Sequence, residues 1–285
     1  MNENQNLIAE LEAKNAALQQ EITKLQYDRK RIEKSRVKIS VLLLALLLIS
    51  MITTTVAWFT ISSIASVDNM KITIGTGVQL LISDEDHGTT LSEYTNEVTS
   101  EQINKQLSTY NTSLEDILLD PLTTSDGKRF YTQRGVERQA NDDSFLQFDL
   151  FFISSEDMWV HLTSSESEPG ANDGTLVFTD STGRQSDIIN CARISFTDNT
   201  TGDTVIYEPN KGTPVAGQTT FDITSPMTYT NATRLFHLEP LTPKMVTVRI
   251  WLEGEDPECD DDVQQANLQV QLNFEGTDDN NIPVN

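Results

Sequence analysis

An uninterrupted run of apolar and small residues near the N-terminus constrains this chain more than any other feature. The run ISVLLLALLLISMITTTVAWF extends from Ile39 to Phe59 and contains no charged residue. As a helix it would be about 31 Å long, which matches a bilayer core of about 30 Å. Trp58 and Phe59 stand at one end, where aromatic side chains anchor at the membrane interface. The sequence therefore predicts one transmembrane helix over residues 37–59.

Basic residues are distributed unequally around this predicted span. Six cations closely precede its uncharged run, which begins at Ile39, namely Arg29, Lys30, Arg31, Lys34, Arg36 and Lys38. The first basic residue after it is Lys71. Because Lys and Arg are enriched in the cytoplasmic flanks of membrane spans, we expect residues 1–36 in the cytoplasm and residues 60–285 outside the cell.

A second interpretation of the apolar segment is a secretion signal that is removed. Thr55-Val56-Ala57 offers a small residue at the position where a signal peptidase cuts, so that a mature chain would start at Trp58. The apolar region is, however, unusually long for a signal peptide. We therefore favour an uncleaved signal anchor, and cleavage between Ala57 and Trp58 with release of the product stays open.

Residues 1–36 carry a heptad pattern that predicts a coiled coil. Every d position is Leu or Ile, and neither Gly nor Pro occurs before the span ends. Asn15 occupies an a position, where a buried Asn favours an in-register parallel dimer. We expect a parallel homodimer, and an amphipathic helix lying on the inner leaflet is the alternative. The dimer would be formed by Ile8, Leu11, Asn15, Leu18, Ile22, Leu25 and Ile32.

Negative charge is concentrated beyond the membrane segment. Residues 1–57 hold eight of the 20 Lys and Arg and six of the 43 Asp and Glu, which leaves 12 basic and 37 acidic residues after Ala57, a net charge of −25. Such a surface repels nucleic acid and anionic lipid headgroups. We expect the chain to have no nucleic-acid partner.

Short segments with alternating polarity predict that the exported part is β-rich. Strands are expected at residues 70–74, 78–82, 145–153, 158–162, 176–179, 191–197, 204–207, 246–252 and 268–274. Clusters of Gly, Asn, Asp, Ser and Pro separate them, as in turns. This pattern favours a mainly β, two-sheet sandwich over an α/β enzyme fold. Residues 84–144 are polar, and we expect a surface insertion there with a short helix.

The last of these segments is the most regular. Its apolar positions are Leu268, Val270, Leu272 and Phe274, and its polar positions are Asn267, Gln269, Gln271 and Asn273. Strict alternation of this kind predicts an antiparallel strand with one buried and one solvated face.

Three stretches of the sequence share a pattern with a known family. They are AWFTISSIASVDNMKITIG after the apolar leader, FLQFDLFFISSEDMWVHL, and QVQLNFEG. Over about residues 57–82, 145–162 and 244–276 the chain resembles the TasA/camelysin-type exported proteins of Gram-positive bacteria. The resemblance implies a jelly-roll-like sandwich at the cell surface and, in some members, assembly into biofilm-matrix fibres by strand donation. Two features depart from that pattern: the predicted coiled coil of residues 1–36, here called the zipper, and the long leader that it forms with the span. A subunit held in the membrane cannot freely donate its N-terminal strand.

Proteins of the camelysin type have been described as metalloproteases, so metal-binding and catalytic motifs matter here. The three histidines, His87, His161 and His237, are widely separated, and the sequence has neither H-E-x-x-H nor a G-x-S-x-G motif. A histidine on an alternating strand, such as His161 beside Trp159, is more often a polar-face residue than a ligand. The sequence therefore indicates a protein that is not an enzyme.

One acidic segment, WLEGEDPECDDD, is the most concentrated polar feature of the chain. Oxygen-rich loops can bind Ca²⁺, although this one lacks the spacing of an EF-hand. A solvated acidic loop is the simpler interpretation. If the loop binds Ca²⁺, the candidate ligands are Glu253, Glu255, Asp256, Asp260 and Asp262.

The only two cysteines, Cys191 and Cys259, both follow the span. In an oxidising compartment they can form one intramolecular disulfide. Sequence spacing does not show whether their Cα atoms come within about 7 Å, so two unpaired thiols are the alternative.

These observations lead to three hypotheses about function. The first is a membrane-anchored structural or adhesive protein, dimerised by its zipper, that presents a β-sandwich to an extracellular matrix or surface partner. The second is a receptor-like module that binds a ligand outside and reports it through the zipper. The third is a surface metalloprotease, for which the sequence offers no ligand constellation.

Overall fold

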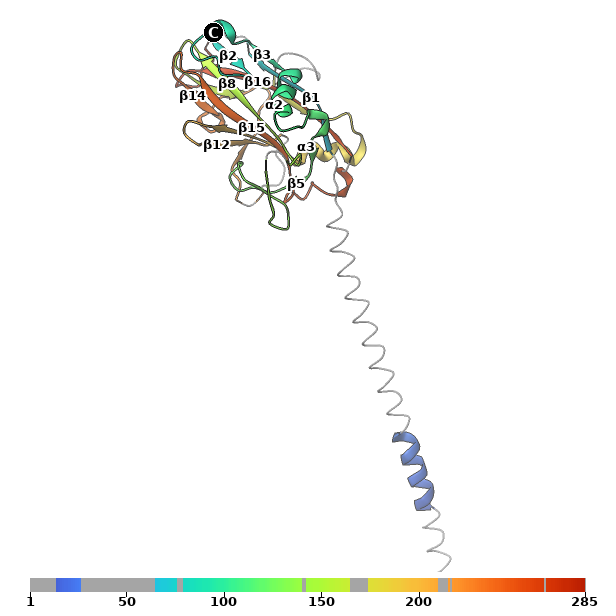
Figure 1. Cartoon of the computed structure of the whole chain (residues 1–285). Coiled ribbons are helices and arrows are strands. Elements are labelled where there is room, and N and C mark those ends of the chain that lie inside the picture. Colours follow the sequence, from blue (N-terminus) through green and yellow to red (C-terminus); the bar gives the residue numbers. More distant parts are fainter. Residues whose placement is uncertain are drawn as a thin grey trace, which may run out of the picture. The chain divides into compact units, whose positions relative to one another are not determined.

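The computed structural model describes residues 14–26, 65–75, 79–139, 142–164, 174–209, 215, 217–263 and 265–284. The chain divides into two units, Met1–Ile61 and Ser62–Asn285. Figure 1 labels the elements of the second unit and colours both units along the sequence.

In the first unit, residues 14–26 form a helix, in agreement with the helical part of the coiled-coil prediction. This helix includes Asn15 and exposes Leu18, Ile22 and Leu25 to 56%, 52% and 63%. A helix that pairs with a second helix exposes large apolar side chains of this kind when it is viewed alone. The other predicted dimer residues, Ile8, Leu11 and Ile32, lie outside the described residues.

The predicted span at 37–59 and the Ala57–Trp58 cleavage position also lie outside the described residues. None of the helices in the described part of the chain is long and apolar enough to cross a membrane. Span, orientation and cleavage therefore stay predictions.

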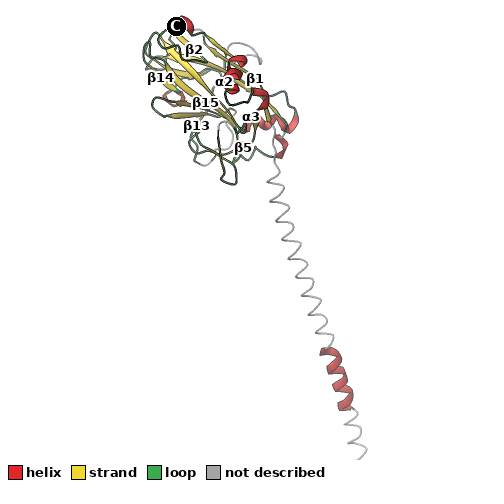
Figure 2. Ribbon diagram, viewed as in Figure 1, coloured by secondary structure: helices red, strands yellow, loops and turns green. Residues whose placement is uncertain are grey.

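The second unit is mainly β, as the sequence predicts, and its described strands form two seven-stranded sheets and a small hairpin (Figures 1 and 2). The first sheet has the order β14-β9-β16-β1-β3, with β10 beside β16 and β4 beside β1. Its strands are β14 (Phe236–Leu238), β9 (Met158–Leu162), β16 (Asn267–Thr277), β1 (Ala65–Ile74), β3 (Glu97–Thr99), β10 (Leu176–Phe178) and β4 (Leu118–Leu119).

The second sheet has the order β13-β12-β11-β15-β8-β2, with β5 beside β15. Its strands are β13 (Thr220–Phe221), β12 (Thr204–Tyr207), β11 (Ala192–Asp198), β15 (Lys244–Glu253), β8 (Leu146–Ser154), β2 (Leu80–Ser83) and β5 (Pro121–Leu122). The hairpin consists of β6 (Phe130–Tyr131) and β7 (Glu137–Arg138).

Helices in the described part of this unit are short. Those of the α type are α2 (Ser100–Ser108) and α3 (Ile188–Cys191). Those of the 3-10 type are η1 (Leu91–Glu93), η2 (Leu114–Asp116), η3 (Gly183–Asp187), η4 (Asn231–Thr233) and η5 (Asp261–Val263). α2 begins with a capping box in which Thr99 and Gln102 satisfy each other's backbone N–H groups.

Interlocking aromatic rings join the two sheets. The ring of Phe152 on β8 lies 5.0 Å from that of Phe274 on β16 and 4.9 Å from that of Phe236 on β14. Phe196 on β11 approaches Phe274 from the same side of the core, at 5.9 Å between ring centroids. These pairs cross from one sheet to the other, within the range where aromatic pairs stabilise each other. The expected two-sheet packing is confirmed at this level.

The last predicted strand, β16, differs from its expected form. It lies inside the first sheet, parallel to β1 and antiparallel to β9 and β10. Its polar side is buried as well, since Gln271 and Asn273 are only 3% and 2% exposed. Their amides are satisfied: Asn273 Nδ2 donates to Thr73 Oγ1 at 2.7 Å, and Gln271 Nε2 donates to the carbonyl oxygen of Gly174 at 2.7 Å. The antiparallel pairing is confirmed for β9 and β10, and Asn267 and Gln269 are half-buried. The expected solvated face was wrong at Gln271 and Asn273, because polar side chains can be buried once they are hydrogen-bonded.

The segment 84–144 is part of the fold, and not the surface insertion expected from its polarity. β3 and β4 add to the first sheet beside β1, and β5 adds to the second sheet beside β15. The short helix expected here is α2, whose Ile103 and Leu107 are buried in the main core. A few well-placed apolar residues therefore fix a segment that is polar on average.

The same segment covers the outer face of the second sheet. Leu122 and Phe130 of this segment, with Phe145 just after it, pack with Ile206 and Trp251 into a second apolar cluster. The ring centroids of Phe130 and Trp251 lie 5.0 Å apart, with an interplanar angle of 64°. All seven residues of β11 are consequently buried, so this strand needs internal partners for every polar side chain that it carries.

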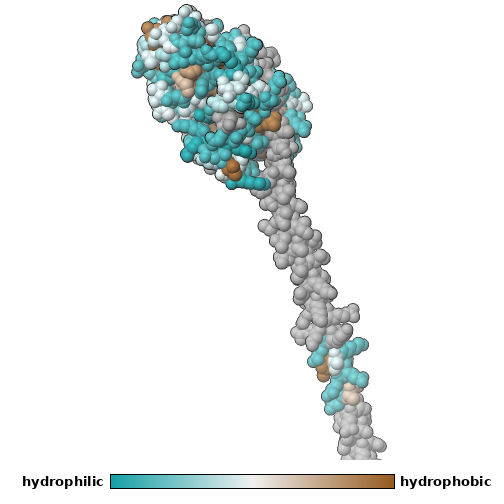
Figure 3. Space-filling view, viewed as in Figure 1, coloured by the Kyte–Doolittle hydropathy of each residue, from teal (hydrophilic) through white to brown (hydrophobic). Residues whose placement is uncertain are grey.

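Outside this core the surface is polar. Figure 3 shows a face of the second unit on which hydrophilic residues dominate and hydrophobic residues occur singly. The strands at the ends of both sheet orders are short: β14 and β3 have three residues, β13 two and β2 four. Short edge strands offer little template for pairing with another sheet.

Candidate functional site

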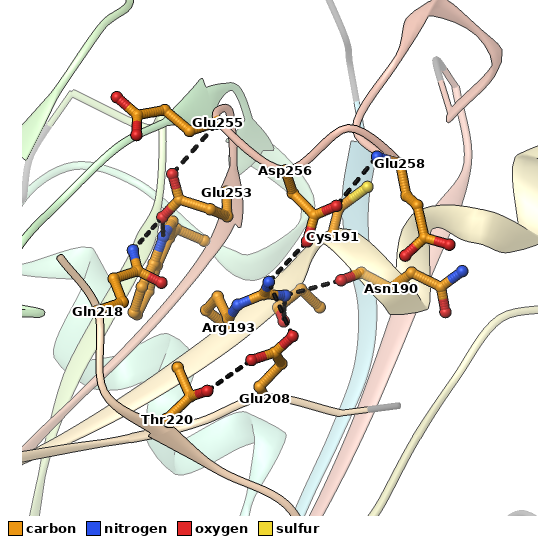
Figure 4. Close-up of polar contacts among 12 residues, drawn as sticks. Asn190, Cys191, Arg193, Glu208, Gln218, Thr220, Glu253, Glu255, Asp256 and Glu258 are labelled. Atoms are coloured by element: carbon orange, nitrogen blue, oxygen red, sulfur yellow. Dashed lines mark hydrogen bonds and ion pairs between the residues drawn. The ribbon is translucent and has the colours of Figure 1, made fainter. Parts of the chain in front are cut away.

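A cluster of buried charges lies where β11 begins and β15 ends (Figure 4). At its centre is Arg193, whose Nη2 lies 2.6 Å from Asp256 Oδ2 and 3.1 Å from Glu208 Oε1. The exposed fractions of Arg193, Glu208 and Asp256 are 0%, 1% and 3%. The second terminal nitrogen of the guanidinium, Nη1, donates to the carbonyl oxygens of Asn190 and Ala192 at 2.7 and 2.9 Å. One buried cation is therefore held by two carboxylates and two carbonyls.

Each carboxylate of this cluster has a further partner that fixes its direction. Glu208 Oε2 accepts a hydrogen bond from Thr220 Oγ1 at 2.6 Å, which links the end of β12 to β13. Asp256 Oδ1 accepts from the backbone N–H of Glu258 at 3.0 Å, inside the loop after β15. The guanidinium thus joins β11, the β12–β13 connection and the acidic segment that follows β15, here called the acidic loop.

Glu253, the last residue of β15, occupies a separate buried position. It accepts hydrogen bonds from Trp251 Nε1 and from the backbone N–H of Glu255, both at 3.2 Å, and from Gln218 Nε2. Burial raises the pKa of Glu253, and these hydrogen bonds oppose the effect. The next residue is Gly254, where the backbone passes close to Pro121. A Cβ atom at this position would lie 3.3 Å from the carbonyl carbon of Pro121, which favours glycine.

The five predicted calcium ligands do not come together. Glu253 and Asp256 have the partners just described, and Glu255 is exposed. Asp260 and Asp262 instead flank Arg184, each with a carboxylate oxygen 2.7 Å from one of its terminal nitrogens. Among the described residues, no group of three or more His, Cys, Asp and Glu side chains is arranged to hold a metal. Cations of the chain itself contact three of the five carboxylates, those of Asp256, Asp260 and Asp262, and the calcium site stays a prediction.

The two cysteines, in contrast, are neighbours. Cys191, at the end of α3, is fully buried, and Cys259 is half-buried against the same core. A side-chain hydrogen bond with Cys259, together with burial, raises the pKa of the Cys191 thiol. Both are present as free thiols, and the disulfide stays a prediction.

The three histidines lie in separate surroundings. His87 Nδ1 lies 3.5 Å from Glu93, and His237 Nε2 lies 2.9 Å from Asp157. His161 is the unexpected one, since it is fully buried on β9 and not on a solvated face. Its Nδ1 lies 3.1 Å from Thr233 Oγ1 and its Nε2 3.0 Å from Thr277 Oγ1. Burial, and then the charge of Arg234, lower the pKa of His161 to about 4, so the ring is neutral at pH 7.

A surface cavity of about 350 Å³ is lined by aromatic rings together with charged and hydroxyl side chains. Trp159 and His237 stand at it with their ring centroids 4.8 Å apart, and the guanidinium of Arg234 stacks 4.4 Å from the Trp159 ring centroid. The rest of the lining consists of Asp198, Thr200, Thr201, Asp203, Leu235, Phe236, Glu239, Thr242, Pro243 and Lys244.

Sequence reasoning missed the centre of the buried cluster. Arg193 and Glu208 stand singly in unrelated strands and carry no motif. The one signal was an Arg inside an otherwise apolar strand, CARISF, because a strand buried on both faces pairs every charge that it contains.

Comparison of the chain with protein-family models, with curated proteins and with solved structures finds no match. The likeness to TasA/camelysin-type proteins therefore stays a resemblance by pattern.

We expect Arg193→Leu to destabilise the second unit by about 3–5 kcal/mol, since it leaves two carboxylates buried without their cation. The matched control is Arg184→Gln, which removes an exposed pair of ion contacts and should cost at most about 1 kcal/mol. Urea unfolding of the full chain in detergent, followed by tryptophan fluorescence, measures both. Equal losses in the two variants would contradict the central role of Arg193.

The buried ring of His161 should make the protein sensitive to acid. As pH falls from about 6.5 to 4, the unfolded chain takes up a proton that the folded chain excludes, so the free energy of unfolding falls by up to about 3 kcal/mol. Urea midpoints measured at pH 7 and pH 4.5 should therefore differ less in His161→Gln than in the unchanged protein. His237→Gln keeps the buried ring and should retain the full difference, and a similar difference in all three proteins would rule the explanation out.

Proposed function

We propose that the protein is a membrane-anchored cell-surface structural or adhesive protein that presents an acidic β-sandwich outside the cell. The observation that carries this proposal is the way the acidic loop is used. Its Asp256 pairs with buried Arg193, and its Asp260 and Asp262 pair with Arg184. In the described residues these groups stabilise the fold and do not converge on a shared reaction centre. A scaffold of this kind suits display better than catalysis.

Anchoring and dimerisation belong to the same proposal. The uncharged segment at 39–59 and the cations before it support a single span with a cytoplasmic N-terminus. The exposed Leu18, Ile22 and Leu25 of the described helix support a parallel homodimer, since each would be covered by its counterpart. Two chains held in one membrane are already parallel, which favours pairing of a short coil.

We further propose that the sandwich is jelly-roll-like, and that it works as an anchored head and not as a fibre subunit. β1 is bonded on one side to β16 and on the other to β3 and β4. Donating this strand to another chain would break both ladders and expose the buried Val67, Met70 and Ile72. The sheet edges are too short to polymerise readily by strand addition.

Protease treatment of intact cells, followed by mass spectrometry of the retained fragment, tests anchoring and orientation together. We expect loss of residues from the β-sandwich and retention of a membrane-bound fragment that contains residues 1–36. In permeabilised cells the same fragment should be digested, which serves as the control. A surface protein whose first residue is Trp58, or digestion of residues 1–36 in intact cells, would overturn the anchored topology.

A receptor-like ligand-binding module is the second candidate, and the cavity beside Trp159 favours it. The cavity combines aromatic rings with carboxylates, hydroxyls and one cation, Lys244, that pairs with Asp198 at 2.6 Å. Pockets that recognise small ligands have this mixture of apolar surface and a few directed polar groups.

The two candidates differ in what the cytoplasmic zipper contacts. If the protein is a receptor, crosslinking in cells should join residues 1–36 to a second protein, and Trp159→Ala should reduce that product several-fold. If it is structural, the zipper should crosslink only to its own copy, and the product should be unchanged in Trp159→Ala. Tyr110→Ala, at an exposed aromatic residue away from the cavity lining, is the matched control.

A further inference from the structure

Ion contacts join the segment that contains Cys191 to the loop that contains Cys259, on both sides of the two cysteines. On one side, Arg184 of η3 contacts Asp260 and Asp262, each at 2.7 Å. On the other, Arg193 contacts Asp256 at 2.6 Å. Cys191 lies between the two arginines in sequence, and Cys259 lies between the acidic residues. Three ion contacts that do not involve the sulfur atoms therefore hold the two short segments side by side.

The two thiols differ in access. Cys191 has no exposed surface, and its Sγ donates to the carbonyl oxygen of Asp187 at 3.6 Å. Cys259 is half-buried, so a reagent in solution can reach it. Its backbone N–H donates to the carbonyl oxygen of Asp256 at 3.0 Å, which fixes the turn that carries it. The pair therefore consists of an accessible cysteine in contact with a shielded one.

We infer that Cys191 and Cys259 form a dithiol that closes to an intramolecular disulfide by exchange with an external disulfide, and that this bond locks the acidic loop over Arg193. In the first step the Cys259 thiolate attacks the external disulfide, which releases one thiol and leaves a mixed disulfide. Cys191 then attacks Cys259 Sγ, and its proton passes to the departing sulfur, which leaves as the second thiol. Two cysteines are oxidised and one external disulfide is reduced to two thiols.

The bond would reinforce the region that contains the buried charges. Asp256, which neutralises Arg193, lies three residues before Cys259, and Asn190, whose carbonyl oxygen also binds Arg193, directly precedes Cys191. Opening of the loop would separate Arg193 from Asp256, and a crosslink between its two walls opposes that motion. In cells, closure rests on the proposed extracellular location, since disulfides persist in oxidising compartments.

The pairing itself can be tested on the purified full chain in detergent. The reduced protein is equilibrated with mixtures of oxidised and reduced glutathione, quenched with acid, unfolded and labelled with maleimide-polyethylene glycol. We expect the number of polyethylene glycol groups per protein to fall from two to none as the fraction of oxidised glutathione increases. Mass spectrometry should then find the peptides of Cys191 and Cys259 linked, with the loss of two hydrogen atoms. Reduction of the closed form should lower the midpoint of thermal unfolding by about 5–10 °C.

Three outcomes would overturn the inference: both thiols remaining free at high oxidised glutathione, a disulfide between two chains, or stable glutathione on Cys259 beside a free Cys191. Cys191→Ala is the control for the mechanism, because it should trap glutathione on Cys259. The labelling of the unchanged protein decides the matter even if that variant does not fold. Because no cell is involved, failure here is distinct from failure of the proposed topology, which surface proteolysis measures.

Discussion

Burial of one guanidinium places a demand on the rest of the second unit. Arg193 sits on a strand covered on both faces, where an unpaired charge would cost several kcal/mol. Its two carboxylate partners come from distant parts of the sequence, Glu208 after β12 and Asp256 after β15. The ion pairs of Arg193 with Glu208 and with Asp256 can both form only when β11, β12 and β15 are in register. Burial of this one charge is therefore linked to the correct register of three strands.

Polar side chains recur in the interior of the second unit, and several of them are held by specific hydrogen bonds. His161 lies between two threonine hydroxyls, and Asn273 on β16 donates to Thr73 on β1. A sandwich with a modest apolar content can bury such groups because a satisfied hydrogen bond removes most of the desolvation penalty. Each also limits which neighbour a strand can have, since a shift of one residue would leave the donor without its acceptor.

The sequence predicted the strands with clear alternation and failed where burial does not follow alternation. β9 and β12 were predicted with their observed bounds, and β8, β15 and β16 within a few residues. The contribution of residues 84–144 was missed, because it depends on isolated residues such as Phe130 that reach a sheet far away in sequence. The acidic loop was identified as the main polar feature, but its partners Arg184 and Arg193 could not be assigned from local spacing. Ion pairs between distant segments leave no periodic signal.

The position of β1 connects the fold to the proposed anchoring. This strand begins at Ala65, six residues after Phe59 at the end of the apolar run, and it is an interior strand of its sheet. In a chain anchored as proposed, a force applied through residues 37–59 would be transmitted to β1, which is held by ladders with β16, β3 and β4. An edge strand in that place would peel away one hydrogen bond at a time. Interior placement of the first strand is thus the arrangement expected of a head that must stay folded while it is tethered.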